Sequence, residues 1–81
     1  MTTTIDKVRG FITTNFYVPD VDALSNEASL LEKGIVDSTG VLEVVSFLEK
    51  EFGIKVDDAE LLPENLDSIG RIAEFVGRKR S

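Results

Sequence analysis

The clearest helical pattern in the chain lies in residues 34–53, which read Gly-Ile-Val-Asp-Ser-Thr-Gly-Val-Leu-Glu-Val-Val-Ser-Phe-Leu-Glu-Lys-Glu-Phe-Gly. The apolar residues recur at helical spacing and form one stripe, Val41, Val44, Val45, Leu48 and Phe52. Asp37 and Ser38 are natural capping residues, and Gly53 suits the left-handed residue after a helix end. The pattern predicts a helix from Ser38 to Phe52, with Phe47 on the opposite face, either exposed or covered by a later segment.

Two more helices are predicted from the same spacing rule. One covers residues 4–16, where Thr3 and Asp6 fit a capping box. The other covers residues 68–78, where Asp67 is a good N-cap and the basic residues at the end suit the negative end of the helix dipole. Both segments carry apolar stripes that can pack against the central helix.

The segments between these helices lack a long periodic pattern. Residues 57–62 predict a short helix, which Pro63 ends or redirects. Residues 54–56 are too short and isolated to form a sheet. Residues 17–37 predict an ordered loop with a short helical turn near residues 22–25. Five apolar residues could pin this loop to the core: Val18, Val21, Leu24, Leu30 and Leu31.

These elements predict an all-α fold. Apolar stripes without a strand partner imply a small four-helix bundle with three longer helices, one short helix and a long first loop. The chain has 81 residues, so we expect one domain over residues 1–81 with one modest core.

The charge of the chain is acidic and unevenly distributed. The formal net charge is −6, and residues 20–67 hold 13 of the 15 acidic residues but only 3 of the 9 basic ones. Such a chain binds nucleic acid poorly and fits a partner with a basic surface. No apolar run approaches a membrane span, and residues 1–6 lack the features of a signal peptide. We therefore expect a soluble, cytoplasmic protein that contacts neither membrane nor nucleic acid.

The composition also argues against catalysis. The chain contains no cysteine and no histidine, which removes the thiolate nucleophile and the commonest general base near neutral pH. Serine–histidine and cysteine–histidine arrangements are excluded. We expect neither catalytic residues nor a resident metal. A calcium site at Asp57, Asp58 and Glu60 is a minor alternative, because the pattern of an EF-hand is absent.

Ser38 is the candidate functional residue, and two interpretations of it are open. Either Ser38 or Asp37 could simply cap the helix, in a small acidic protein-interaction module. Alternatively, Ser38 is an attachment point, because a helix N-terminus offers unpaired N–H groups and a partial positive charge that suit a phosphate ester. In that case Asp37 flanks the site and contacts a metal or a partner during modification.

Three stretches of the chain resemble the acyl carrier protein family. They are Gly-Ile-Val-Asp-Ser at 34–38, Val-Leu-Glu-Val-Val at 41–45 and Leu-Glu-Lys-Glu-Phe-Gly-Ile-Lys-Val at 48–56. The run Pro-Glu-Asn-Leu-Asp-Ser-Ile at 63–69 adds to the match. The resemblance covers most of the chain and implies a non-catalytic carrier of fatty-acid, polyketide or related secondary metabolism.

The resemblance implies a cofactor and a set of partners. Ser38 would carry 4′-phosphopantetheine, donated from coenzyme A by a magnesium-dependent phosphopantetheinyl transferase, and acyl or aminoacyl groups would be held on it as thioesters. A loading ligase and downstream acyl-processing enzymes would bind the carrier, expected as a monomer, through its acidic helix. The positions that match the family's docking surface are Thr39, Leu42, Glu43, Glu49 and Glu51. The family usually has leucine where this chain has Thr39, and Gly40 after it predicts a looser first turn.

Overall fold

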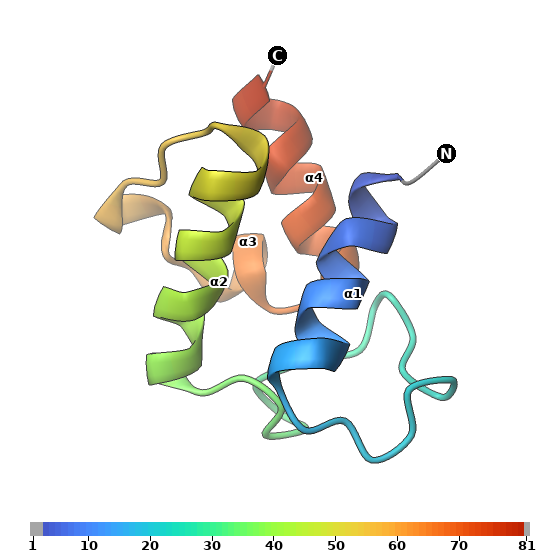
Figure 1. The fold of residues 1–81 in the computed structure, drawn as a ribbon. Helices are drawn as coiled ribbons and strands as arrows, with labels where there is room; N and C mark the ends of the chain where they lie inside the picture. The colour runs from blue at the N-terminus through green and yellow to red at the C-terminus, as the bar shows by residue number, and fades with distance from the viewer. Residues whose placement is uncertain (1–2, 81) are drawn as a thin grey trace.

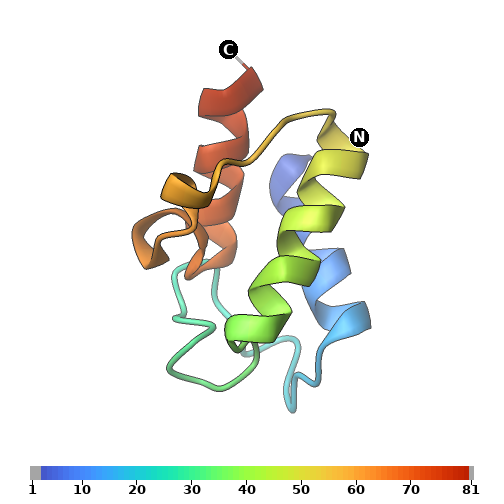
Figure 2. The ribbon, with the colours of Figure 1, turned by 90° about the vertical axis from the view of Figure 1, so that its left-hand side faces the viewer.

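Four α-helices and one turn of 3-10 helix form the regular structure of residues 3–80, the part of the chain that the computed structural model describes. They are α1 (Thr4–Asn15), α2 (Ser38–Phe52), the 3-10 helix (Asp58–Glu60), α3 (Pro63–Leu66) and α4 (Ile69–Arg80). α1 runs in the opposite direction to α2 and α4, and the long first loop closes the end of the bundle where α2 and α4 begin (Figures 1 and 2). The predicted all-α bundle is confirmed.

Local sequence determines where α1 begins and where α2 ends. Asp6 N–H donates to Thr3 Oγ1 at 3.1 Å and Thr3 N–H to Asp6 Oδ2 at 3.4 Å, which is the predicted capping box. Gly53 has φ 66° and ψ 26°, the left-handed conformation expected after α2. The predicted bounds of α2 are therefore confirmed at both ends.

The core lies where α1, α2 and α4 meet. Its buried apolar residues are Val8 and Ile12 from α1, Val44 and Leu48 from α2, Leu66 from α3, Ile69, Ile72, Phe75 and Val76 from α4, and Leu24, Leu30, Ile35 and Val36 from the first loop. Four residues of the loop belong to this core, so the loop is pinned as predicted. Of the five residues expected to pin it, Val21 and Leu31 instead stay 43% and 40% exposed.

Two local predictions for α2 and the first loop are wrong. Phe47 is covered by an earlier helix: its ring stacks on Phe11 of α1 with centroids 4.2 Å apart. Residues 22–25 form no helical turn; single turns replace it, in which Ala23 N–H donates to Asp20 O at 3.2 Å. A side chain of α1 also holds the loop in place, because Arg9 Nη2 donates to Leu24 O at 2.6 Å.

The connection from α3 to α4 corrects the predicted N-cap. Ser68 Oγ accepts from Arg71 N–H at 3.1 Å, so Ser68 rather than Asp67 caps α4. The Asp67 carboxylate instead accepts from Ser29 Oγ at 2.8 Å and from Leu31 N–H at 3.1 Å. Asp67 therefore joins the first loop to the α3–α4 junction, a role that requires contacts between residues far apart in the sequence.

The short helix is also displaced from its predicted position. Residues 57–62 contain only the 3-10 turn, and Pro63 begins α3 rather than ending a helix. Proline is favoured at the first helical position because its missing N–H needs no partner there. The predicted short helix exists, therefore, but it covers residues 63–66.

Candidate functional site

Ser38 is the first residue of α2, and its side chain is exposed. The capping role belongs to Asp37, whose Oδ1 accepts from Gly40 N–H at 2.7 Å. Within residues 3–80, Ser38 Oγ has no hydrogen-bond partner. Asp37 is therefore the residue that caps α2, and the Ser38 hydroxyl is exposed and makes no hydrogen bond within this part of the chain.

Gly40 is a packing residue. It is buried, and a Cβ added to it would lie 2.8 Å from Phe16 Cε1 and 3.3 Å from Val36 Cγ1. The looser first turn stays a prediction, and the structure adds a packing role for Gly40. A larger residue at this position would have to displace the Phe16 and Val36 side chains, so Gly40 lets the end of α1 and the last residues before Ser38 approach α2 closely.

An apolar pocket of about 310 Å³ opens beside Ser38. Besides Ser38, its lining residues are Leu31, Val41, Leu42, Leu61, Leu62, Pro63 and Leu66. Leu31 from the first loop, Leu42 from α2 and Leu62 before α3 remain 40%, 59% and 42% exposed. Besides Ser38, only Leu42 was predicted to belong to the functional site, because the pocket joins three segments that are distant in the chain.

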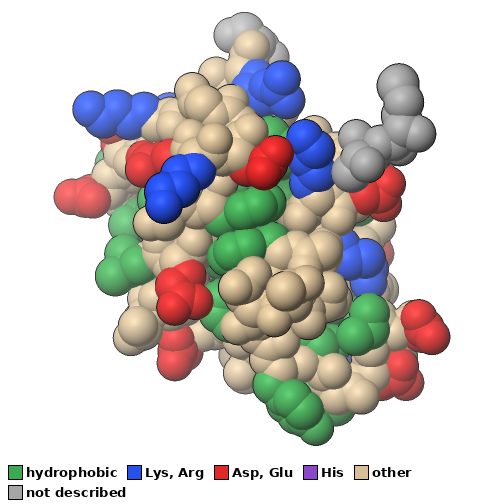
Figure 3. Space-filling model, in the orientation of Figure 1, with side chains coloured by type: hydrophobic (Ala, Val, Ile, Leu, Met, Phe, Trp, Pro, Cys, Tyr) green, Lys and Arg blue, Asp and Glu red, His purple; other side chains and the backbone are tan. Residues whose placement is uncertain are grey.

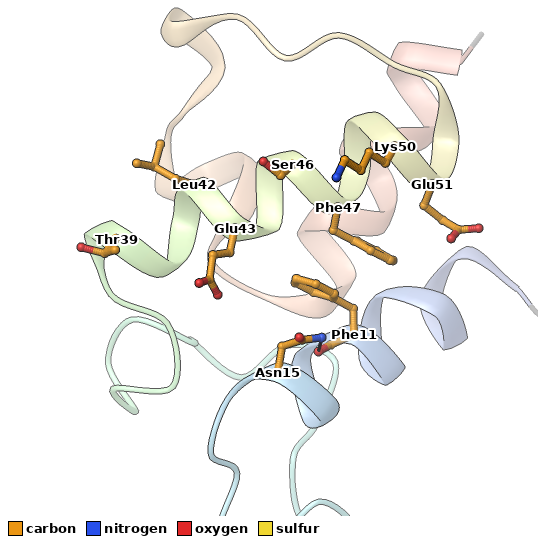
Figure 4. Close-up of a pocket in the computed structure, with 9 residues that line it drawn as sticks. All are labelled: Phe11, Asn15, Thr39, Leu42, Glu43, Ser46, Phe47, Lys50 and Glu51. Atoms are coloured by element: carbon orange, nitrogen blue, oxygen red, sulfur yellow. Dashed lines mark hydrogen bonds between the residues drawn. The ribbon is translucent and has the colours of Figure 1, made fainter.

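A second, wider hollow of about 700 Å³ lies between α1 and α2. Apolar side chains form the floor of this groove and charged side chains surround it (Figure 3). Thr39 and Glu43 line its end near Ser38, while Lys50 and Glu51 line the other end (Figure 4). Leu42 points away from α1 and contributes to both hollows.

The acidic residues predicted for docking differ in their surroundings. Glu43 is exposed and has no ion-pair or hydrogen-bond partner within residues 3–80. Glu49 is half-buried, and its Oε2 accepts from Val56 N–H at 3.0 Å. Glu51 lies 3.3 Å from Lys7 Nζ of α1. Glu43 is thus the acidic side chain that is both close to Ser38 and unpaired.

The minor alternative of a calcium site finds no support in the geometry. Residues 3–80 contain no group of three or more acidic side chains that could hold a metal ion. Glu60 accepts from Asp57 N–H at 3.0 Å and from Lys79 Nζ at 2.8 Å. The Asp57 N–H, followed by the Lys79 ammonium, holds the pKa of Glu60 below its ordinary value. The negative charge of this carboxylate is therefore already balanced by the Lys79 ammonium.

None of the helices in residues 3–80 has the length and hydropathy needed to cross a membrane.

Comparison with known proteins identifies the family of the chain. The family model of the phosphopantetheine attachment site matches residues 6–76. An acyl carrier protein of Thermotoga maritima is 34% identical over 73 residues, which cover 90% of this chain and 86% of the relative. The probable acyl carrier protein PigG of a Serratia species is 28% identical over 75 residues, 93% of this chain and 86% of the relative. The acyl carrier protein AcpXL of Mesorhizobium japonicum is 38% identical over 56 residues, 69% of this chain and 59% of the relative.

The chain belongs to the phosphopantetheine-attachment family, the class that contains the acyl carrier proteins. It is a phosphopantetheine-bearing acyl carrier of fatty-acid or secondary metabolism, and its 4′-phosphopantetheine is attached covalently. Carriers of this class bind a phosphopantetheinyl transferase and acyl-processing enzymes.

Proposed function

We propose that Ser38 carries the 4′-phosphopantetheine and that the protein presents fatty acyl groups on it without catalysing their conversion. The observation that supports this assignment is the free Ser38 hydroxyl at the start of α2, left without an internal partner because Asp37 caps the helix. The site fits the group, because a phosphodiester on Ser38 would lie at the positive end of the helix dipole.

In the attachment reaction Ser38 would be the acceptor. Its oxygen forms a bond to the phosphorus of coenzyme A that bears pantetheine, the bond from that phosphorus to the adenosine bisphosphate breaks, and the hydroxyl proton passes to the transferase or to solvent. Asp37 keeps the first turn of α2 in place through Gly40 N–H while the hydroxyl reacts. Once attached, the group supplies a thiol that holds an acyl chain as a thioester.

The pocket beside Ser38 favours a fatty acyl cargo over an aminoacyl one. Its lining is apolar apart from Ser38 itself. Each buried methylene contributes about 0.8 kcal/mol, so an alkyl chain of medium length would gain by entering the pocket. The ammonium group of an aminoacyl cargo would have to leave water without a partner there, which is unfavourable.

The proposed function is tested by loading the chain from octanoyl-coenzyme A. Incubation of the unmodified protein with a broad-specificity transferase should add one octanoyl-phosphopantetheine per chain, seen by intact mass. Neutral hydroxylamine should then remove the octanoyl group and leave the arm in place, as expected of a thioester. A protein that stays unmodified beside a positive-control carrier would contradict the proposal and favour a simple interaction module.

Docking of the loading enzymes should depend on Leu42 and Glu43. Both side chains are exposed close to Ser38, with Thr39 beside them. Glu49 and Glu51 already have partners within the chain, so we propose that they contribute less.

We expect Glu43→Lys to slow loading by a transferase or ligase with a basic docking surface, because it replaces an attraction by a repulsion. The loss should be several-fold at low ionic strength and shrink as salt screens the charges. Steady-state loading rates at several salt concentrations measure it, with Glu27→Lys in the first loop as a control of equal charge change. Equal rates for both variants at low salt would contradict a docking role for Glu43.

Three further predictions remain proposals. We propose that the carrier works as a monomer, that it acts in the cytoplasm, and that residues 1–81 form one domain. Size-exclusion chromatography with light scattering would test the first of these.

A further inference from the structure

One wall of the pocket beside Ser38 has little regular structure of its own. Leu61, Leu62, Pro63 and Leu66 form this wall, which we call the outer wall, and it lies in the connection between α2 and α4. The regular structure of this connection consists of one 3-10 turn and the four-residue helix α3. The backbone hydrogen bonds that the N–H groups of the outer wall donate are local, to Asp58 O, Glu60 O and Leu62 O, and Leu66 packs into the core. Side chains from other elements therefore help to fix the position of the rest of the wall.

Those side chains come from α4. Lys79 Nζ lies 2.8 Å from Glu60 Oε1 and 3.1 Å from Glu60 Oε2, and the two side chains are only 25% and 28% exposed. The residue before Lys79, Arg78, donates from Nη2 to Asn65 Oδ1 at 2.9 Å. Asn65 Nδ2 in turn donates to Glu60 O at 3.0 Å. The end of α4 thus holds the outer wall immediately before Leu61 and again within α3.

Lys79 also contacts the core of the bundle. Its ammonium lies 6.0 Å from the centroid of the Phe75 ring, and Phe75 is a core residue with 2% exposure. Glu60, by contrast, belongs to the 3-10 turn, whose capping box with Asp57 is a local contact. The Lys79–Glu60 pair therefore joins a weakly structured segment to the core of the bundle.

We infer that Lys79 is a positioning residue for the pocket: by holding Glu60, it keeps Leu61 and Leu62 against the space beside Ser38 and sets how well an attached acyl chain is sheltered there. This inference rests on the proposed function for its ligand, an alkyl chain tethered at Ser38. The contact that carries it exists in the unmodified protein, so it can be tested without any cargo.

The first test measures amide hydrogen exchange in the unmodified protein. Leu61, Leu62 and Leu66 N–H donate to Asp58 O, Glu60 O and Leu62 O at 3.2, 2.8 and 3.1 Å, so their exchange reports the order of the outer wall. Lys79→Met should speed their exchange about two- to fivefold, the range of a partly exposed ion pair, and leave Val44 and Leu48 of α2 unchanged. Lys79→Arg should restore protection.

Two controls make this test specific. Lys55→Met removes the same charge from an exposed lysine without a partner in residues 3–80, and it should not change the exchange of the outer wall. Glu60→Gln keeps an acceptor for Asp57 N–H, and its effect should not add to that of Lys79→Met in the double variant. Unchanged exchange in Lys79→Met, or fully additive effects, would overturn the inference.

The second test uses the loaded protein and depends on chain length. Hydroxylamine cleavage of the octanoyl thioester should be about two- to fivefold faster in Lys79→Met than in the unaltered protein, while cleavage of the acetyl thioester should not differ, because acetyl is too short to need the pocket. If Lys79→Met accelerated the cleavage of both thioesters equally, Lys79 would have no role in sheltering the acyl chain. A failure to load any variant would count against the proposed function alone, because the exchange test would still decide the role of Lys79 in the outer wall.

Discussion

Ser38→Ala should abolish the attachment of phosphopantetheine while leaving the fold intact. In the proposed function the hydroxyl oxygen of Ser38 forms the phosphodiester, so alanine would leave nothing to react. The variant should fold normally because Asp37, and not Ser38, accepts the capping hydrogen bond from Gly40 N–H. Intact mass after incubation with coenzyme A and a transferase measures the attachment, and thermal unfolding measures the fold.

Two neighbouring substitutions serve as matched controls for Ser38→Ala. Thr39→Val removes the adjacent hydroxyl and should leave one phosphopantetheine per chain. Asp37→Ala should lower the free energy of unfolding by about 1 kcal/mol through loss of the N-cap, yet keep the reactive hydroxyl. Modification that persists in Ser38→Ala but disappears in Thr39→Val would show that the phosphopantetheine is attached to Thr39 and not to Ser38.

Leu48→Ala should produce the largest loss of stability among single truncations of α2. The Leu48 side chain is fully buried in the core where α1, α2 and α4 meet. Truncating such a residue costs about 2–5 kcal/mol, because apolar contacts are lost and a cavity remains. Domains of this size are stable by only about 5–15 kcal/mol, so the midpoint of thermal unfolding should fall by many degrees.

Leu42→Ala provides the control for this prediction on the same helix. Leu42 is 59% exposed, so its truncation should change the free energy of unfolding by no more than about 0.5 kcal/mol. Chemical denaturation of both variants, followed by far-ultraviolet circular dichroism, compares them directly. Equal destabilisation by the two substitutions would show that the core is not where the structure places it.

The helices could be predicted from the sequence because their signals are local. The stripe of α2, its terminal Gly53 and the capping box of Thr3 and Asp6 all act within a few residues, and all three are present in the structure. The predictions that were wrong concern contacts between residues far apart in the sequence. Asp67 looked like a helix cap, but its carboxylate is used by Ser29 and Leu31, which lie 38 and 36 residues away in sequence.

The candidate site shows the same division. The exposed serine at the start of α2 could be predicted, because it depends on residues 37–40 alone. The pocket could not, since Leu31, Leu42 and Leu62 lie far apart in the sequence and meet only in the folded chain. The packing role of Gly40 was equally hidden, because it depends on Phe16 approaching from the end of α1.

The central claim is that a single phosphopantetheine is attached to Ser38. Peptide mapping by tandem mass spectrometry of the wild-type protein, after reaction with coenzyme A and a transferase, tests it most directly. Our account predicts one modified peptide, with the fragment ions placing the phosphodiester on Ser38 and on no other hydroxyl. A phosphodiester mapped to Thr39, Ser46 or another residue, or a protein that accepts none under conditions that modify a control carrier, would contradict it.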